Sequence, residues 1–463
     1  WEHSQIQLTH FLAGRDFDVT TRVYRNDFER AWKKLNNFAY ETSSTNRELS
    51  AILANPEDGI NQEYYQVLTG QKDSVQTFEN LIVGTNDREY YSQGIQSELR
   101  AQGEFAGLEH NIHAGVRFHQ DQIKRDHFEE TYAMRSGRMT DLGLGKVFTS
   151  VNLEETDALS VHIQDTIQWN ALQATFGIRG EFIDSYYQNR AEGKSGEWLE
   201  KESRIWLPSA SFFYQASDNL GFLFGVHEGF VPTSPKEDIS VRIENSVNFE
   251  LGARYKNNGT NFEVVAFFND FKNLKESCTF SASSNCASAV NTDAEYNGGE
   301  VDVYGLEVTA GHTVSLNDAI DMPISVVYTH TQSEFKTSFN SDFIMWGNIT
   351  AGDELPYLPD NQLTISIGLD ADEWQVALMA KYTGEMKEVS GQAQAGEYLP
   401  LVGDVVNAYT VVDLTANYDL GDYGLVYLKI DNLLDDDNIV SRRPYGARPS
   451  KPQQAFVGYK YSF

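Results

Sequence analysis

The clearest chemical feature of the sequence is the grouping of basic and aromatic side chains at two places in an otherwise acidic chain. The two groups are Arg442, Arg443, Tyr445 and Arg448, and His119, Lys124, Arg125 and His127. Guanidinium groups bind carboxylate and phosphate oxygens through paired hydrogen bonds. Each group is therefore a candidate contact for an anionic ligand, which its local positive field would attract. The alternative for each group is pairing with neighbouring acidic side chains or with lipid phosphates.

Sequence motifs of catalysis and of metal binding are absent. The chain contains no Gly-x-Ser-x-Gly, no His-Glu-x-x-His and no glycine-rich phosphate loop followed by lysine. His110 and His113 are three residues apart on an expected strand, which places their rings on opposite faces. The acidic run 435–438 lacks the spaced glycine and final glutamate of an EF-hand. We therefore expect no enzyme activity, no metal site and no cofactor.

Composition narrows the class of protein further. The 463 residues carry a formal charge of −31, which argues against a nucleic-acid partner because phosphate binding needs a basic surface. The mean hydropathy is −0.44, and no apolar run approaches the length of about 18 residues that a transmembrane helix needs. No signal peptide is visible, and the first residue is Trp1. We therefore expect the chain to be the later part of a longer or processed product.

Alternation with period two predicts an all-β chain. In the stretch 247–255, for example, Val, Phe, Leu, Ala and Tyr alternate with Asn, Glu, Gly and Arg. The alternating segments are about ten to thirteen residues long, whereas strands of soluble sheets usually have about five or six. A tilted strand that crosses a bilayer needs about nine to eleven residues. The segment lengths therefore favour transmembrane strands.

The spacing of these segments predicts about seventeen antiparallel strands. They are 3–13, 17–26, 88–100, 107–120, 154–169, 171–184, 203–215, 219–230, 245–256, 260–271, 300–314, 322–335, 360–370, 373–384, 408–419, 423–433 and 452–463. Short turns alternate with long polar connections such as 27–87 and 121–152, and we expect both basic groups to lie in such connections. This asymmetry is typical of outer-membrane barrels, with short periplasmic turns and long extracellular loops. Since a closed antiparallel barrel needs an even number of strands, an odd number implies either missing N-terminal strands, which the strand directions favour, or one wrongly predicted strand.

The C-terminal segment carries a further signal. Tyr459, Tyr461 and Phe463 alternate along the last expected strand and end on the terminal carboxylate. A terminal phenylalanine preceded by alternating aromatic residues is similar to the assembly signal of bacterial outer-membrane barrels. We therefore expect these three residues to direct assembly in the outer membrane of a Gram-negative bacterium.

Several short motifs, in their order and spacing, resemble those of TonB-dependent receptors. The segments are 207–211 (LPSAS), 218–220 (DNL), 225–235 (GVHEGFVPTSP), 249–254 (FELGAR), 267–271 (FFNDF), 305–307 (GLE), 431–435 (DNLLD) and 444–449 (PYGARP). They are close to the branch that includes ferric dicitrate and siderophore receptors. Matching pieces recur along the whole chain.

The resemblance implies a barrel of 22 strands with an N-terminal plug domain. Residues 1–463 would then be the C-terminal portion of the barrel, without the plug and without about five strands. It implies active uptake of a ferric chelate, ferric citrate or a siderophore, with iron present only as chelated cargo. The implied partners are the TonB-ExbB-ExbD system, reached through the missing region, and outer-membrane lipids and lipopolysaccharide. The expected state is a monomer.

Two features of the long connections give smaller predictions. Cys278 and Cys286 form an isolated pair, which favours one disulfide in an oxidising compartment, with two unpaired thiols as the alternative. The connection 27–87 contains a helical-looking run, 46–53, which could cover the mouth of the barrel or only its rim.

Three other functions remain open at this point. The first is TonB-dependent uptake of another nutrient, such as cobalamin or an oligosaccharide. The second is a passive porin, which needs no TonB. The third is a soluble extracellular adhesin built from β-sandwiches, in which the apolar strand faces would pack against each other.

Overall fold

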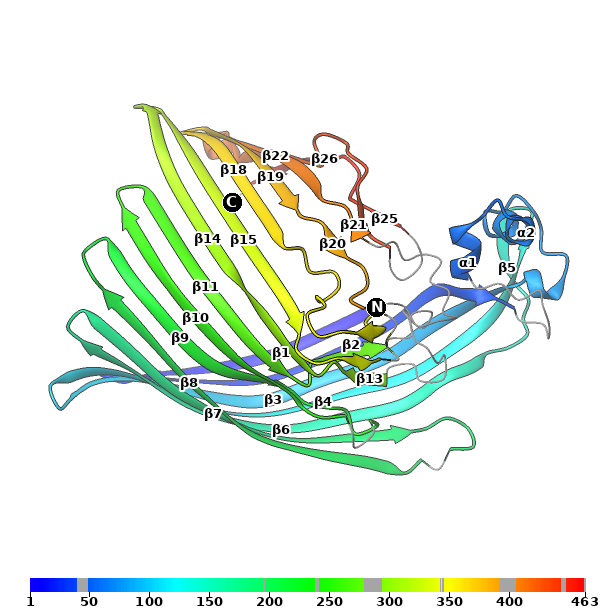
Figure 1. Ribbon diagram of the computed structural model, residues 1–463, viewed down its shortest axis with the longest axis horizontal. Coiled ribbons are helices and arrows are strands. Elements are labelled where there is room, and N and C mark those ends of the chain that lie inside the picture. Colours follow the sequence, from blue (N-terminus) through cyan, green and yellow to red (C-terminus); the bar gives the residue numbers. More distant parts are fainter. Residues whose placement is uncertain are drawn as a thin grey trace. The chain divides into compact units, whose positions relative to one another are not determined.

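The chain forms two compact units, and Figure 1 shows the strands and helices that make them up. A computed structural model describes residues 1–39, 49–194, 196–237, 241–278, 294–341, 343, 345–391, 405–442 and 447–461. The first unit comprises Trp1–Gln168, Thr175–Ser209 and Val231–Ile243, and the second comprises Trp169–Ala174, Ala210–Phe230 and Glu244–Phe463. Strands dominate both units, and their long strands belong to a large antiparallel sheet.

The first unit combines long strands with two short helices. Its elements are β1 (Glu2–Ala13), β2 (Phe17–Phe38), α1 (Leu49–Ala54), α2 (Gly59–Leu68), η1 (Thr77–Glu79), β3 (Leu81–Phe105), β4 (Leu108–Arg135), β5 (Arg138–Asp141) and most of β6 (Val147–Trp169), β7 (Leu172–Asn189) and β8 (Trp198–Gln215). Strand β2 pairs with β1 and β3, and β4 pairs with β3 and β6, all antiparallel.

The second unit consists of strands joined alternately by short turns and longer segments. Its long strands are β9 (Leu220–Val231), β10 (Glu244–Asn257), β11 (Thr260–Lys272), β14 (Glu300–Asn317), β15 (Ile320–Phe335), β18 (Asn361–Ala371), β19 (Trp374–Thr383), β22 (Tyr409–Asp419), β23 (Leu425–Asp431) and β26 (Gln454–Lys460). Its short elements are β12 (Lys275–Cys278), β13 (Ala294–Asn297), β16 (Phe339–Asn340), β17 (Asn348–Ile349), β20 (Met386–Lys387), β21 (Val405–Val406), η3 (Gly421–Tyr423), β24 (Ile439–Ser441) and β25 (Arg448–Pro449).

The seventeen predicted strands are confirmed, and the large sheet contains them together with the four-residue β5. Two of the connections are shorter than predicted. The stretch 27–87 is strand as far as Phe38 and again from Leu81, and 121–152 is strand as far as Arg135 and again from Val147. In these extensions polar and apolar residues are mixed on the same face, so the alternation disappears from the sequence. The backbone hydrogen bonds between strands do not depend on apolar side chains and continue.

One face of the second unit is apolar and exposed. The strand register places Leu251, Ala266 and Leu306 side by side, and likewise Ile367, Leu378 and Leu414. Leu251 is 62% exposed, and Leu378 is 45% exposed. An apolar face of this extent is unstable in water, so it requires a lipid or protein cover. The packing between apolar faces that a soluble β-sandwich needs is not found in the described residues.

The buried cores lie among the connections rather than between sheet faces. In the first unit, α1 and α2 pack onto the ends of β2, β3 and β4 through Phe38, Leu49, Ile52, Tyr64, Val67, Leu81 and Met134. The two helices appear together beside β5 in Figure 1. In the second unit, a separate core consists of Val301, Phe335, Phe343, Trp346 and Ile349. Each core therefore stabilises the segments that join long strands.

The helix predicted at 46–53 is confirmed in part, as α1 begins at Leu49 and residues 40–48 lie outside the described part. The described helices α1 and α2 have six and ten residues. No described helix has both the length and the apolar character to cross a membrane. Cys286 lies outside the described residues, so its disulfide with Cys278 stays a prediction.

The buried carboxylate of Glu79 holds the segment that follows α2. Lys72 donates to its Oε1 at 2.7 Å, while the backbone amides of Val75 and Gln76 donate to Oε2 at 2.6 and 2.7 Å. Burial raises the pKa of this carboxyl, but the hydrogen bonds from Lys72, Gln76 and Val75 outweigh burial and lower the pKa below 4.5. The ionised form of Glu79 therefore stabilises the segment.

This contact predicts a local pH dependence. Because the folded pKa is lowered, the stabilisation is present above pH 4.5 and is lost as pH falls through the folded pKa. Glu79→Gln should weaken the segment at neutral pH by about 1–2 kcal/mol, as loss of a capping carboxylate does, and should remove the acid sensitivity. Hydrogen-exchange protection factors of residues 59–80 measure both effects. Equal acid sensitivity in wild type and variant would contradict this role of Glu79.

Candidate ligand-binding face

The polar face of the first unit brings together side chains from β2, β3 and β4. The register places Tyr24 opposite Gly94, and Gly94 opposite His119. A Cβ atom at Gly94 would lie 2.6 Å from the Tyr24 hydroxyl and 2.5 Å from the Phe118 carbonyl oxygen. The missing side chain at Gly94 therefore lets Tyr24 reach across β3 to His119.

Tyr24, Arg117 and His119 form a hydrogen-bonded cluster. The Tyr24 Oη atom lies 2.6 Å from Nδ1 of His119, and Arg117 donates to Tyr24 Oη from Nε and Nη2 at 3.1 and 2.9 Å. Arg117 Nη2 also lies 3.0 Å from His119 Nδ1. Since a guanidinium can only donate, Nδ1 is the acceptor, which leaves Nε2–H to face Asp121 Oδ2 at 3.3 Å. The network therefore fixes the histidine tautomer.

The charge of Arg117 is not neutralised by a direct partner. Among the described residues, no carboxylate oxygen lies within 4 Å of its guanidinium, which is held by the phenol and imidazole of Tyr24 and His119. Its carbon Cζ lies 5.7 Å from the centre of the Tyr24 ring. Arg117 is thus a positioned cation with donor capacity left for an anion.

A second group lies further along the same face of β3 and β4. Arg88 donates from Nε to His127 Nε2 at 2.9 Å, and the His127 side chain is buried. Arg125, opposite Arg88 in the register, donates from Nη1 to Asn152 Oδ1 at 2.9 Å and to Glu154 Oε1 at 2.8 Å. Arg88 has no ion pair among the described residues, whereas Glu154 neutralises Arg125. Arg88 therefore has no carboxylate partner among the described residues, and neither has Arg30, which lies opposite it in the register of β2 and β3.

The structure corrects where one predicted group lies. His119, Arg125 and His127 belong to β4 and not to a loop, because β4 continues to Arg135. Even numbers of residues separate these three side chains, which puts them on one face, while Lys124 lies on the other face with Glu89 and Asp126, each at 3.0 Å. The prediction that His119, Arg125 and His127 contact ligand is not tested by this geometry.

The other predicted group is described only in part. Arg442 forms an ion pair with Glu388, whose side chain is fully buried, and donates to the Val405 carbonyl oxygen at 2.8 Å. Arg448 lies in β25 opposite Ser441. Arg443 and Tyr445 lie outside the described residues. Arg442 therefore joins three chain segments of the second unit, and ligand contact by this group stays a prediction.

Sequence reasoning missed Tyr24, Arg88 and Arg117. Arg117 stands two positions before His119, so the period of two along β4 places both on one face. Tyr24 and Arg88 give no comparable signal, because only the register between strands brings them to His119 and His127.

The segment that includes Asn432 has a structural role. Asn432 has a φ of 50°, is 1% exposed, and donates from Nδ2 to the carbonyl oxygens of Asp436 and Lys451 at 3.1 and 2.9 Å. Asp431 pairs with Lys429 and Lys451. The motif 431–435 therefore fixes the start of the connection between β23 and β26.

The described residues contain no group of three or more His, Cys, Asp or Glu placed to hold a metal ion.

The aromatic pair near the C-terminus is exposed. Tyr459 and Tyr461 are 59% and 54% exposed, and Tyr459 lies opposite Val426 on the apolar face of β26. Phe463 lies outside the described residues. Their role in assembly stays a prediction.

Long antiparallel strands with one exposed apolar face and one charged face define a β-sheet membrane protein. Residues 4–433 match the family model described as TonB dependent receptor-like, beta-barrel. The chain belongs to this family, whose members are receptors and transporters of the Gram-negative outer membrane rather than enzymes. The outer membrane is therefore its location.

Named relatives agree with this assignment. The chain is 24% identical over 298 residues to the ferrichrome outer membrane transporter/phage receptor of Escherichia coli K12, covering 62% of this chain and 36% of that protein. The fold is similar to the siderophore receptor PiuA from Acinetobacter baumannii (TM-score 0.70, 14% identity, 98% of this chain and 63% of that one). It is also similar to the ferric citrate transporter FecA (TM-score 0.68, 15% identity, 98% and 60%). The chain spans about a third of the curated relative.

Proposed function

We propose that this chain is part of an outer-membrane receptor that takes up an anionic ferric chelate, ferric citrate or a siderophore. The observation that carries the proposal is that arginines on the polar face of a strongly acidic protein, Arg88 and Arg117 among them, have no carboxylate partner among the described residues. A chelate with free carboxylates or phenolates needs such donors and needs no protein ligand to its iron. The names of the ferrichrome, siderophore and ferric citrate relatives support the same class of cargo.

The family supports an energy-driven mechanism for the whole protein. In this proposal the long connections face the exterior, the cargo enters from there, and the TonB-ExbB-ExbD system acts on a plug that belongs to the same receptor. The receptor works as a monomer among outer-membrane lipids and lipopolysaccharide. The chain described here contributes the wall of the barrel and the arginines that attract the anion.

Binding to the full-length receptor tests the cargo class. We expect saturable binding of ferric citrate or of at least one anionic ferric siderophore, and no binding of cyanocobalamin or a maltooligosaccharide. Binding of cobalamin or sugar, with no iron chelate bound, would overturn the proposal in favour of another nutrient.

Uptake in cells tests the mechanism. Accumulation of the radioactive iron chelate should require TonB, so a strain without TonB should take up only background levels. Equal uptake with and without TonB would instead identify a passive porin.

A further inference from the structure

Two histidine rings meet on the polar face of the first unit. His113 of β4 and His162 of β6 have ring centres 5.0 Å apart, with an angle of 67° between the ring planes. The register places His113 opposite Gln164, and His162 opposite Gly115. The two imidazoles are therefore diagonal neighbours on adjacent strands, and only the register brings them together from distant parts of the sequence.

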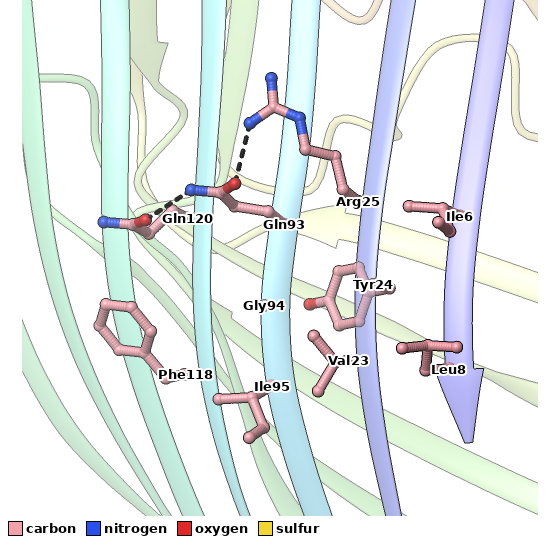
Figure 2. Close-up of a pocket in the computed structure, with 10 residues that line it drawn as sticks. All are labelled: Ile6, Leu8, Val23, Tyr24, Arg25, Gln93, Gly94, Ile95, Phe118 and Gln120. Carbon is pink, nitrogen blue, oxygen red and sulfur yellow. Dashed lines mark hydrogen bonds between the residues drawn. The ribbon is translucent and has the colours of Figure 1, made fainter.

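Gly115 lets the His162 ring lie over β4. A Cβ atom at Gly115 would lie 2.4 Å from Cε1 of His162 and 3.0 Å from its Nε2, so any side chain there would move the ring. Figure 2 shows the same arrangement on the neighbouring strand β3, where the hydroxyl of Tyr24 points to Gly94. The missing side chain at Gly115 thus allows the second imidazole to reach the first.

The His113 ring has a buried nitrogen that is unpaired among the described residues. This atom, Nε2, is covered, although the residue as a whole is only half-buried. An unpaired buried polar atom costs about 1–3 kcal/mol, and an edge-to-face contact between two aromatic rings contributes about 0.5–1.5 kcal/mol. The contact between the rings at best offsets the unpaired nitrogen, whereas a ligand bound to that nitrogen would remove the cost.

A neutral imidazole nitrogen is a ligand for divalent transition-metal ions. Since Zn–N bonds are about 2.0–2.1 Å long, an ion bound to one nitrogen lies about 3 Å from the ring centre. Two rings whose centres are 5.0 Å apart can therefore share one ion. Mg²⁺ and Ca²⁺ take oxygen ligands instead, so the chemistry of the pair selects Ni²⁺, Cu²⁺ or Zn²⁺.

The charges around the pair leave one carboxylate for a cation. The charged groups on the neighbouring strands are Glu98 and Arg100 of β3 and Arg179 and Glu181 of β7. Glu181 neutralises Arg179, and Asp18 stands opposite Arg100 in the register. Glu98 stands opposite Gly115, and its ion pair with Arg22 is long, at 3.8 Å. Its negative charge is therefore available beside the two rings.

We propose that His113 and His162 bind a divalent transition-metal ion through one nitrogen each, with Glu98 as the neighbouring negative charge and water completing the coordination. The bound ion joins β4 to β6. Two imidazoles are fewer than the four protein ligands of a closed zinc site, so the ion keeps open positions. This inference goes beyond the proposed uptake of a ferric chelate and does not depend on it, because the chelated iron needs no protein ligand.

Titration of the full-length receptor with Cu²⁺ tests the site, on protein purified without a histidine tag. Copper is the probe because it binds nitrogen ligands most strongly among these ions, and its electron paramagnetic resonance spectrum reports the nitrogens bound to it. We expect one Cu²⁺ per receptor, bound by two imidazoles. His113→Ala and His162→Ala should each lower the affinity by about tenfold or more, since even residues that only support a ligand change metal affinity about 10–100-fold.

Two further variants separate this site from other histidines. Gly115→Ala keeps both rings but displaces His162, so it should also lower the affinity. His312→Ala is the matched control and should bind Cu²⁺ as the wild type does, because His312 of the second unit is held by the Thr260 hydroxyl, 2.8 Å from its Nδ1.

Two results would overturn the proposal. The first is a wild-type receptor that binds no Cu²⁺ at one equivalent. The second is wild-type affinity in any one of the His113→Ala, His162→Ala and Gly115→Ala variants, because the copper is then an adventitious ion only. Far-ultraviolet circular dichroism confirms that each variant retains its strands before it is titrated.

Discussion

Replacing Leu378 with arginine is expected to destabilise the protein by about 2–4 kcal/mol in a lipid bilayer, the cost of a cation on the lipid-facing side near the membrane centre. Leu378 lies in β19 between Ile367 and Leu414 on the apolar face and is 45% exposed. An arginine there would place its charge in hydrocarbon. The free energy of unfolding by guanidinium chloride in phospholipid vesicles measures the loss.

The adjacent residue supplies the control. Met379 is 39% exposed but faces the other side of β19, between Ser366 and Asp413. Met379→Arg gains a carboxylate neighbour in a polar environment, so we expect its free energy of unfolding to stay within about 1 kcal/mol of wild type. Equal losses for the two variants would contradict the assignment of the two faces.

Replacing Arg117 with glutamine should weaken binding of the anionic ferric chelate by about tenfold or more. A hydrogen bond to a charged group contributes about 1.5–3 kcal/mol, and 1.4 kcal/mol corresponds to a factor of ten in Kd. The loss is expected to be large because no described carboxylate neutralises Arg117, so its full charge is available to the ligand. Titration of the full-length receptor with the chelate that the wild type binds measures the effect.

Arg254→Gln is the matched control for this second prediction. Arg254 lies on the polar face of β10 and is paired with Glu263 of β11. Because its charge is already neutralised, its loss should leave the affinity within about twofold of wild type. Unchanged binding by Arg117→Gln, in a wild type that binds the chelate, would show that the cargo is right and the site is wrong.

The sequence predicted the strands because lipid and lumen impose different side chains on alternate positions. The segment 247–255 shows this directly, as Phe249 and Leu251 lie on the apolar face that the register continues into β11 and β14. The prediction lost the ends of β2, β3, β4 and β6, where polar and apolar residues are mixed on the same face. Hydrogen bonding between strands maintains those extensions, and it leaves no pattern in a single sequence.

The candidate site was predictable only in part for a related reason. His119, Arg125 and His127 attract attention as a dense group, but their neighbours come from strands far away in the sequence. Tyr24 reaches His119 across 95 positions, through the space that Gly94 leaves. Such contacts depend on the register between strands. The turns and the apolar patterns of the whole sheet set that register.

Both the membrane location and the polar binding face require that one side of each long strand meets hydrocarbon and the other side does not. A nitroxide scan along β19 in a reconstituted bilayer tests it, with collision rates measured for molecular oxygen and for a water-soluble nickel chelate. We predict that positions 376, 378 and 380 collide preferentially with oxygen, and that 375, 377, 379 and 381 collide preferentially with the nickel chelate. A scan without period two, or protection of 376, 378 and 380 from both reagents, would contradict it, because those side chains would then be packed against protein.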